Sequence, residues 1–304
     1  MIYAFIVGLL AATLRVATPL IFGTLGELFS ERAGILNLGI EGIMLLGAFT
    51  GFAAAYLTGS LWVGVLAACL IGVLAGLLMA FMTVYLGVNQ HVSGLGITLF
   101  CTGLAYYAFR VIFGTPSHPP QLIPFERVNL MGNIAVLGPI FRQYPLTYYA
   151  IVLVPVVWVI LYRTNFGLKI RAVGENPEAA DAAGINVYGV RTISLMIAGA
   201  FMGVAGAFLT LSTLGFFTFD IIAGRGWVCI ALVIFANWIP QRVLWGAFIF
   251  GGVQALQLRL QLTGIKFPYE LFLTLPYVVT IIALTLANRN AAYPAALLKA
   301  YKRE

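Results

Sequence analysis

Residues 61–86 read LWVGVLAACLIGVLAGLLMAFMTVYL, an apolar run without a single charged side chain. An α-helix needs about 20 apolar residues to cross a hydrocarbon layer of about 30 Å, and this run is long enough. It begins directly after Thr58-Gly59-Ser60, which is typical of a tight turn, and another apolar run precedes that turn. The stretch therefore predicts one of two membrane-spanning helices joined by a short connection.

The same pattern recurs along the whole chain. Of the 304 residues, 62% are hydrophobic and 9% are charged, against about 25% charged in ordinary globular domains, and the mean hydropathy is +1.00. We expect an all-α, polytopic transmembrane helical bundle that forms a single domain over residues 1–304. Small residues four positions apart, as at Gly72 and Gly76 or Gly199 and Gly203, permit close helix packing. Nine spans are predicted, at 5–29, 35–57, 61–86, 92–112, 145–163, 191–213, 227–238, 243–260 and 269–287, and the short seventh one indicates a broken or tilted helix.

Two segments between the predicted spans bear on the topology. Residues 113–144 contain Pro116, Pro119, Pro120, Pro124 and Pro139, which favour an ordered external loop. The segment 164–190 is flanked by Arg163, Lys169, Arg171 and Arg191, and basic residues favour the cytoplasmic side. With nine spans and a cytoplasmic C-terminus, the N-terminus is expected outside.

Within 164–190, residues 174–185 predict a short helix with defined ends. Asn176 is a good N-cap, Pro177 suits the first helical position, and Gly184 favours a left-handed stop. A rigid helix of about two turns between two spans is suited to receive a push from a soluble partner, whereas a well-capped surface loop is the alternative. The predicted contact residues are Glu175, Asn176, Pro177, Glu178, Ala179, Ala180, Asp181 and Gly184.

The sequence lacks the common signals of an enzyme. It has no Gly-x-x-x-x-Gly-Lys-Ser/Thr loop for ATP, and no His-Glu-x-x-His or Cys-x-x-Cys motif. The two histidines, His91 and His118, fall on separate loops, and the three cysteines lie in apolar runs without paired spacing. We therefore expect no catalytic residues, no metal and no cofactor. The net charge of +7 is explained by basic cytoplasmic loops and does not indicate nucleic-acid binding.

Six stretches carry a resemblance to a known family, in the order 14–20 (LRVATPL), 30–42 (SERAGILNLGIEG), 89–94 (NQHVSG), 174–185, 224–227 (GRGW) and 251–260 (GGVQALQLRL). The chain resembles the inner-membrane permease subunits of ABC importers in the branched-chain amino acid and simple-sugar permease superfamily. It is most similar to the shorter permease paralogue of the nucleoside branch. The stretches follow the family order, and the resemblance they carry extends over nearly the whole chain.

The resemblance implies a bacterial plasma (inner) membrane subunit that forms half of a translocation pathway for nucleosides by alternating access. It implies that 174–185 is the coupling helix, seated in a groove of an ABC ATPase subunit that hydrolyses the ATP. Further implied partners are a second, paralogous permease subunit and an extracellular or periplasmic substrate-binding protein. The alternatives are a permease for simple sugars or branched-chain amino acids, and an ion-coupled secondary transporter. The last would need acidic residues in mid-membrane, of which the sequence offers few.

Five polar residues are candidates for the substrate pathway: Arg15, Asn37, Glu41, Asn89 and Gln90. Placing a charge at membrane depth costs several kcal/mol, so Arg15 is expected to have a specific role there. It is either a pathway residue or a structural partner for a carboxylate or for carbonyls freed by Pro19. Asn37 and Glu41 are expected to share a helix face, where they contact substrate hydroxyls or bond to a broken backbone. Asn89 and Gln90 are more typical of helix caps than of ligands.

Overall fold

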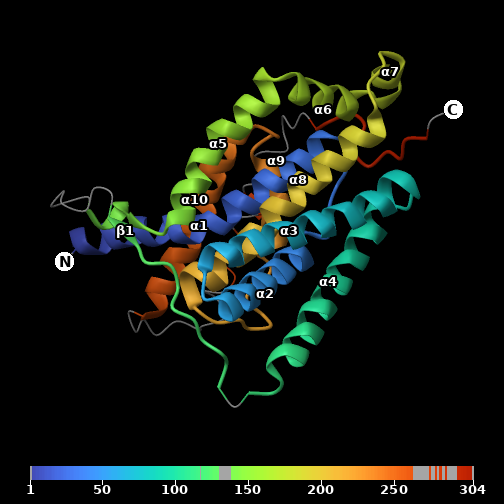
Figure 1. The fold of residues 1–304 in the computed structure, drawn as a ribbon. Helices are drawn as coiled ribbons and strands as arrows, with labels where there is room; N and C mark the ends of the chain where they lie inside the picture. The colour runs from blue at the N-terminus through green and yellow to red at the C-terminus, as the bar shows by residue number, and fades with distance from the viewer. Residues whose placement is uncertain are drawn as a thin grey trace.

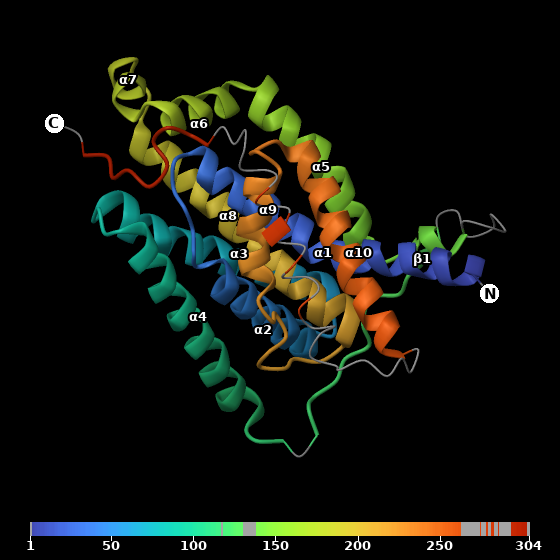
Figure 2. The same ribbon diagram turned by 180° about the vertical axis from the view of Figure 1, so that it is seen from behind.

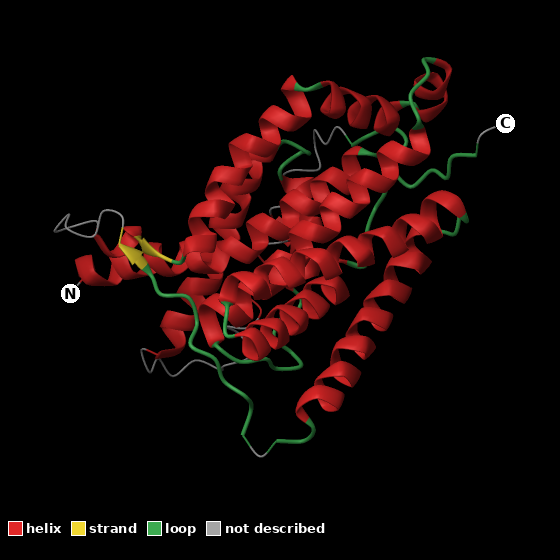
Figure 3. Cartoon of the chain, in the orientation of Figure 1, coloured by secondary structure: helices red, strands yellow, loops and turns green. Residues whose placement is uncertain are grey.

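In a computed structural model the chain is built almost entirely of helices, shown in red in Figure 3. The structure describes residues 2–116, 118–129, 138–262 and 293–302, together with the isolated positions 274, 278, 281, 282 and 285. The long helices are α1 (Ile2–Arg32), α2 (Ile40–Thr58), α3 (Leu61–Ala80), α4 (Gln90–Phe113), α5 (Pro145–Arg163), α8 (Val187–Phe208) and α10 (Pro240–Leu262). The short ones are α6 (Asn165–Glu175), α7 (Pro177–Ala182) and α9 (Arg225–Phe235).

The remaining elements are small. The π-helical turns η1 (Phe81–Tyr85) and η3 (Leu209–Leu214) continue α3 and α8. The 3-10 turn η2 (Gly138–Phe141) lies just before β2 (Arg142–Gln143), which pairs antiparallel with β1 (Val128–Asn129).

The predicted helical membrane class is confirmed, but nine full spans are not. Among the described residues, seven helices are long and apolar enough to cross a membrane: α1, α2, α3, α4, α5, α8 and α10. The predicted span 227–238 corresponds to α9, which has 11 residues and is too short to cross alone. Its length is limited because the backbone turns left-handed on both sides, at Gly224 before it and at Asn237 after it. The predicted span 269–287 lies outside the described residues except at the isolated positions.

The centre of the bundle consists of α1, α2, α3 and α8, with α5 and α10 on one side and α4 on the other (Figures 1 and 2). The predicted small-residue packing is confirmed where α3 meets α8. A Cβ atom at Gly199 would overlap the carbonyl oxygen of Gly72, and one at Gly72 would overlap that of Gly199. Backbone atoms of the two helices are therefore in direct contact, as is typical of small-residue interfaces in membranes.

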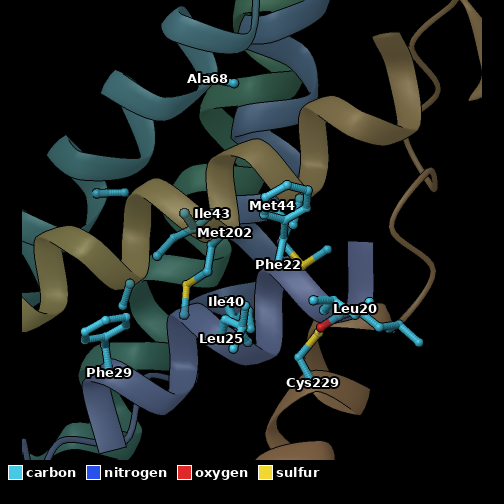
Figure 4. Close-up of a cluster of buried hydrophobic side chains, with 14 of the residues drawn as sticks. Leu20, Phe22, Leu25, Phe29, Ile40, Ile43, Met44, Ala68, Met202 and Cys229 are labelled. Atoms are coloured by element: carbon cyan, nitrogen blue, oxygen red, sulfur yellow. The ribbon is translucent and has the colours of Figure 1, made fainter. Parts of the chain in front are cut away.

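Large buried side chains lie where α1, α2 and α8 meet (Figure 4). Leu25, Phe29, Ile40, Met44 and Met202, from α1, α2 and α8, are all buried in one cluster. The ring of Phe29 stacks on that of Phe201 at 6.1 Å. The first two and the sixth of the predicted spans thus form one core.

Different segments of the chain lie at the two ends of the bundle. The N-terminal part of α1 lies with the β1–β2 pair, and Gln143 Nε2 donates to the carbonyl of Ala11 (3.2 Å). The described part of 113–144 also bonds back to the bundle, because Leu122 N–H donates to Gly215 O (2.8 Å). At the opposite end lie α6, α7 and the C-terminal segment 293–302 (Figures 1 and 2).

Candidate functional site: a capped helix and an inner polar layer

The segment 176–185 folds as a short helix with both ends capped. Asn176 Oδ1 accepts the N–H of Ala179 (3.0 Å), and Pro177 occupies the first helical position. The predicted N-terminal cap is therefore confirmed. It satisfies one of the backbone donors that every helix start leaves unpaired.

The C-terminal stop is also confirmed. Gly184 has a φ of 81°, its N–H donates to Asp181 O (2.8 Å), and Ile185 N–H donates to Ala180 O (3.0 Å). This pair of bonds around a left-handed glycine is a Schellman motif. Because both ends are bonded, a helix of only six residues keeps a defined shape.

The predicted contact residues all lie at one exposed end of the bundle. Ala180 faces inward and is buried, Pro177 and Asp181 are half-buried, and the exposed ones are Glu175, Asn176, Glu178, Ala179 and Gly184. Glu175 is the last residue of α6, an amphipathic helix whose start is capped by Thr164. Together α6 and α7 present a rigid, charged edge.

Arg191 borders the segment 164–190 in the sequence, but it is not a surface residue. It is buried near the start of α8, where its Nε donates to Ala33 O (3.2 Å) and its Nη1 to Lys299 O (3.4 Å). This one side chain therefore joins α8 to the end of α1 and to the C-terminal segment.

Deeper in the bundle, Asn37 and Glu41 do not share a helix face, so that expectation was wrong. Asn37 lies in the connection before α2, because its Oδ1 accepts the N–H of Gly39 (3.0 Å) and forms a local turn in place of a helical one. Its own N–H donates to Glu27 Oε1 (2.9 Å). Asn37 is fully buried and holds the connection against α1.

Glu41 bonds to a broken backbone, one of the two roles expected for it. Its Oε1 accepts the N–H of Gly224 (2.8 Å) and its Oε2 the N–H of Gly226 (2.7 Å). These donors belong to the start of α9, where the helix dipole also favours a carboxylate. A half-buried Glu41 thereby fixes the beginning of the short helix to α2.

Two buried carboxylates that the sequence analysis missed lie on α1, which packs against α9. Glu27 and Glu31, one turn apart on α1, are 0% and 1% exposed. Glu31 Oε2 accepts the indole N–H of Trp238 (2.6 Å), and Arg32 donates to the carbonyl of the same Trp238 (3.0 Å). Their i, i+4 spacing near the end of the first apolar run was the available signal.

Asn89 and Gln90 lie at the start of α4, and their side chains have different roles. Asn89 Oδ1 caps α4 by accepting from His91 N–H (2.9 Å), as its residue type suggested. Gln90 is buried and its Oε1 accepts the N–H of Leu36 (2.8 Å), so it secures the connection before α2 from the α4 side.

Arg15 is half-buried on α1, toward the end that carries the β1–β2 pair. The structure thus places Asn37, Glu41 and Gln90 around the buried connection between α1 and α2, whereas Arg15 lies elsewhere. Together with Glu27 and Glu31, these three residues form what we call the inner polar layer. Among the described residues, no three His, Cys, Asp or Glu side chains are grouped to hold a metal ion.

Comparison with known proteins gives a consistent picture. Residues 9–284 match the family model described as "Branched-chain amino acid transport system / permease component". A putative glucose ABC transporter permease protein of Haloferax volcanii is 39% identical over 99% of both chains. A guanosine ABC transporter permease protein of Bacillus subtilis is 37% identical over 90% of both chains. A nucleoside ABC transporter permease protein of Lactococcus lactis subsp. cremoris is 38% identical over 95% of this chain and 94% of its own. No solved structure matches the chain.

Proposed function

This chain belongs to the family of branched-chain amino acid transport system permease components, and from that membership we propose that it forms half of the translocation pathway of an ATP-driven importer of nucleosides. The relatives are permease proteins of ABC transporters, so the chain is a multi-pass membrane transporter subunit and not an enzyme. The whole of 1–304 is taken as one permease domain.

The observation that carries the substrate proposal is the pair of relatives named for guanosine and nucleosides, each covering at least nine-tenths of this chain. A second candidate substrate is a simple sugar, because the Haloferax relative is named for glucose and covers 99% of the chain. Nucleosides and sugars share a ring with several hydroxyls, and a nucleoside adds an aromatic base. The substrate test must therefore separate recognition of the base from recognition of the sugar.

Deleting this subunit should reduce uptake of labelled guanosine and uridine to background and leave leucine uptake unchanged. Unlabelled nucleosides should compete for uptake in the parent strain, whereas free ribose and glucose should compete poorly. If glucose competes fully and nucleosides do not, the sugar assignment replaces this one. An ion-coupled transporter is indicated instead if an uncoupler stops uptake at constant cellular ATP.

The proposed mechanism is alternating access driven through α7. We propose that a separate ATPase subunit binds the exposed side of α7 and that a second, paralogous permease completes the pathway. A substrate-binding protein would deliver nucleosides at the opposite face. The capped ends of α7 support this role, because a helix that keeps its shape transmits a displacement. Arg191 and Gln90 connect that end of the molecule to the buried connection between α1 and α2.

The proposed orientation in the bacterial plasma membrane has the N-terminus and 113–144 outside, and α7 and the C-terminus in the cytoplasm. The arrangement of the bundle supports this orientation. The N-terminal part of α1 lies at the same end as the described part of 113–144, and α7 lies at the same end as the C-terminal segment (Figure 1).

Single cysteines test this orientation in a chain whose native Cys69, Cys101 and Cys229 are replaced by alanine. In intact cells, an impermeant thiol reagent should label Thr115→Cys and leave Asn176→Cys and Lys299→Cys unlabelled until the membrane is opened. Labelling of Lys299→Cys from outside contradicts the orientation.

A further inference from the structure

A second segment lies beside α7 and is joined to its base. Ala296 N–H donates to Gly174 O (2.9 Å), and Ala295 N–H donates to the Glu175 carboxylate (3.3 Å). Ala296 is 2% exposed, and the carbonyl of Lys299 accepts from Arg191. The described C-terminal segment, 293–302, therefore has a fixed position next to α7 (Figure 2).

The C-terminal segment forms a ridge between two hollows. One hollow, of about 290 Å³, separates it from α7 and is lined by Glu175 and Glu178 on one side and by Lys299 and Lys302 on the other. The other, of about 330 Å³, separates it from the start of α4, with Asn89 among the lining residues. The two carboxylates and the two lysines are exposed, so this end offers a partner both signs of charge.

The small size of α7 indicates that a partner must extend beyond it. A stable protein interface covers about 800 Å² on each side, from about 20–30 residues. The helix α7 has six residues, and one of them, Ala180, faces the core. Any protein that binds α7 stably must therefore also cover the surface around it, and the C-terminal segment is hydrogen-bonded to the residues that precede α7.

We propose that the C-terminal segment 293–302 is the second half of the docking surface for the ATPase subunit. In this complex, acidic side chains of the ATPase subunit face Lys299 and Lys302. This inference rests on the proposed function, since it takes the ATPase as the occupant of this end. The ATPase would grip α7 and the C-terminal segment as one unit. Arg191 would then pass the displacement of the segment to α8 and to the end of α1.

The test is the affinity of the purified ATPase subunit for the permease complex in lipid nanodiscs. The double variant Lys299→Glu/Lys302→Glu should weaken binding about tenfold, because like charges facing across an interface oppose association. The neutral pair Lys299→Gln/Lys302→Gln should give a smaller loss. High salt should narrow the difference between wild type and the neutral pair.

The matched control is Arg110→Glu/Arg142→Glu, which makes the same change in charge at exposed positions in the last turn of α4 and in β2, away from α7 (Figure 1). Glu178→Arg on α7 is measured in parallel, and thermal unfolding of every variant confirms an intact fold. If Glu178→Arg weakens binding and the lysine reversal does not, the inference is overturned and the proposed function stands. If neither Glu178→Arg nor the lysine reversal changes the affinity, or if the wild-type complex binds no ATPase, the ATPase does not dock at this end. The inference and the proposed function are then both overturned. Weakening by the lysine reversal beyond that of the control supports the inference.

Discussion

Replacing Gly199 with leucine is expected to prevent the accumulation of folded protein in the membrane. A Cβ atom at this position overlaps the carbonyl oxygen of Gly72, and backbone atoms cannot rotate away as a side chain would. The helices α3 and α8 must then separate, which removes contacts along their whole crossing. Overpacking typically costs about 1–3 kcal/mol, and more is expected here because backbone atoms must move, so the loss is a large part of the stability of a typical domain. The measurement is the monodisperse fraction after detergent extraction, together with its unfolding temperature.

The matched control is Gly103→Leu. Gly103 is also a helical glycine in a predicted span, but a Cβ atom there meets nothing within 4 Å. This variant should keep the yield and the unfolding temperature of the wild type. Equal behaviour of the two variants would contradict the close packing of α3 against α8.

Replacing Gly184 with valine is expected to uncouple transport from ATP hydrolysis in a protein that is inserted normally. A Cβ atom at Gly184 meets nothing within 4 Å, so the variant introduces no clash. The cost comes from the backbone, because a φ of 81° is disfavoured for a β-branched residue by about 1–2 kcal/mol. That cost falls on a helix of six residues with little stability of its own. Uptake and the stimulation of ATPase activity by the loaded binding protein are the quantities to measure.

Gly184→Asn serves as the control, because asparagine tolerates the left-handed conformation better than other residues with a side chain. It should retain most of the stimulation that Gly184→Val loses, at equal abundance in the membrane. An unchanged transport rate in Gly184→Val and in Glu178→Arg would mean that α7 is only a surface loop and does not transmit the push of the ATPase.

The features that the sequence predicted correctly are determined by residues that lie close together in the chain. The apolar run 61–86 is sufficient to specify a membrane helix, because a backbone in hydrocarbon must satisfy its own hydrogen bonds. The ends of α7 follow from Asn176, Pro177 and Gly184, whose preferred backbone conformations are properties of each residue. The shortness of α9 was likewise visible as a short apolar run.

The inner polar layer could not be predicted in the same way. Glu41 finds its donors at Gly224 and Gly226, and Glu31 finds Trp238, across gaps of 183 to 207 positions in the chain. No local pattern marks such pairs, and the helical spacing of Asn37 and Glu41 even suggested a shared face that the turn at Gly39 removes. The C-terminal segment was missed for a similar reason, because its place beside α7 depends on bonds to Gly174 and Arg191.

The sequence by itself thus determined that the chain is a helical membrane protein with one short, capped helix between two spans. Hydropathy and residue-specific backbone preferences act over one or two helical turns, and a single chain displays them directly. Only the tertiary structure decided which buried polar groups meet and which segment lies beside α7. Those choices depend on how α1, α2, α8 and α9 pack, and packing is fixed by complementary surfaces that the order of residues does not show.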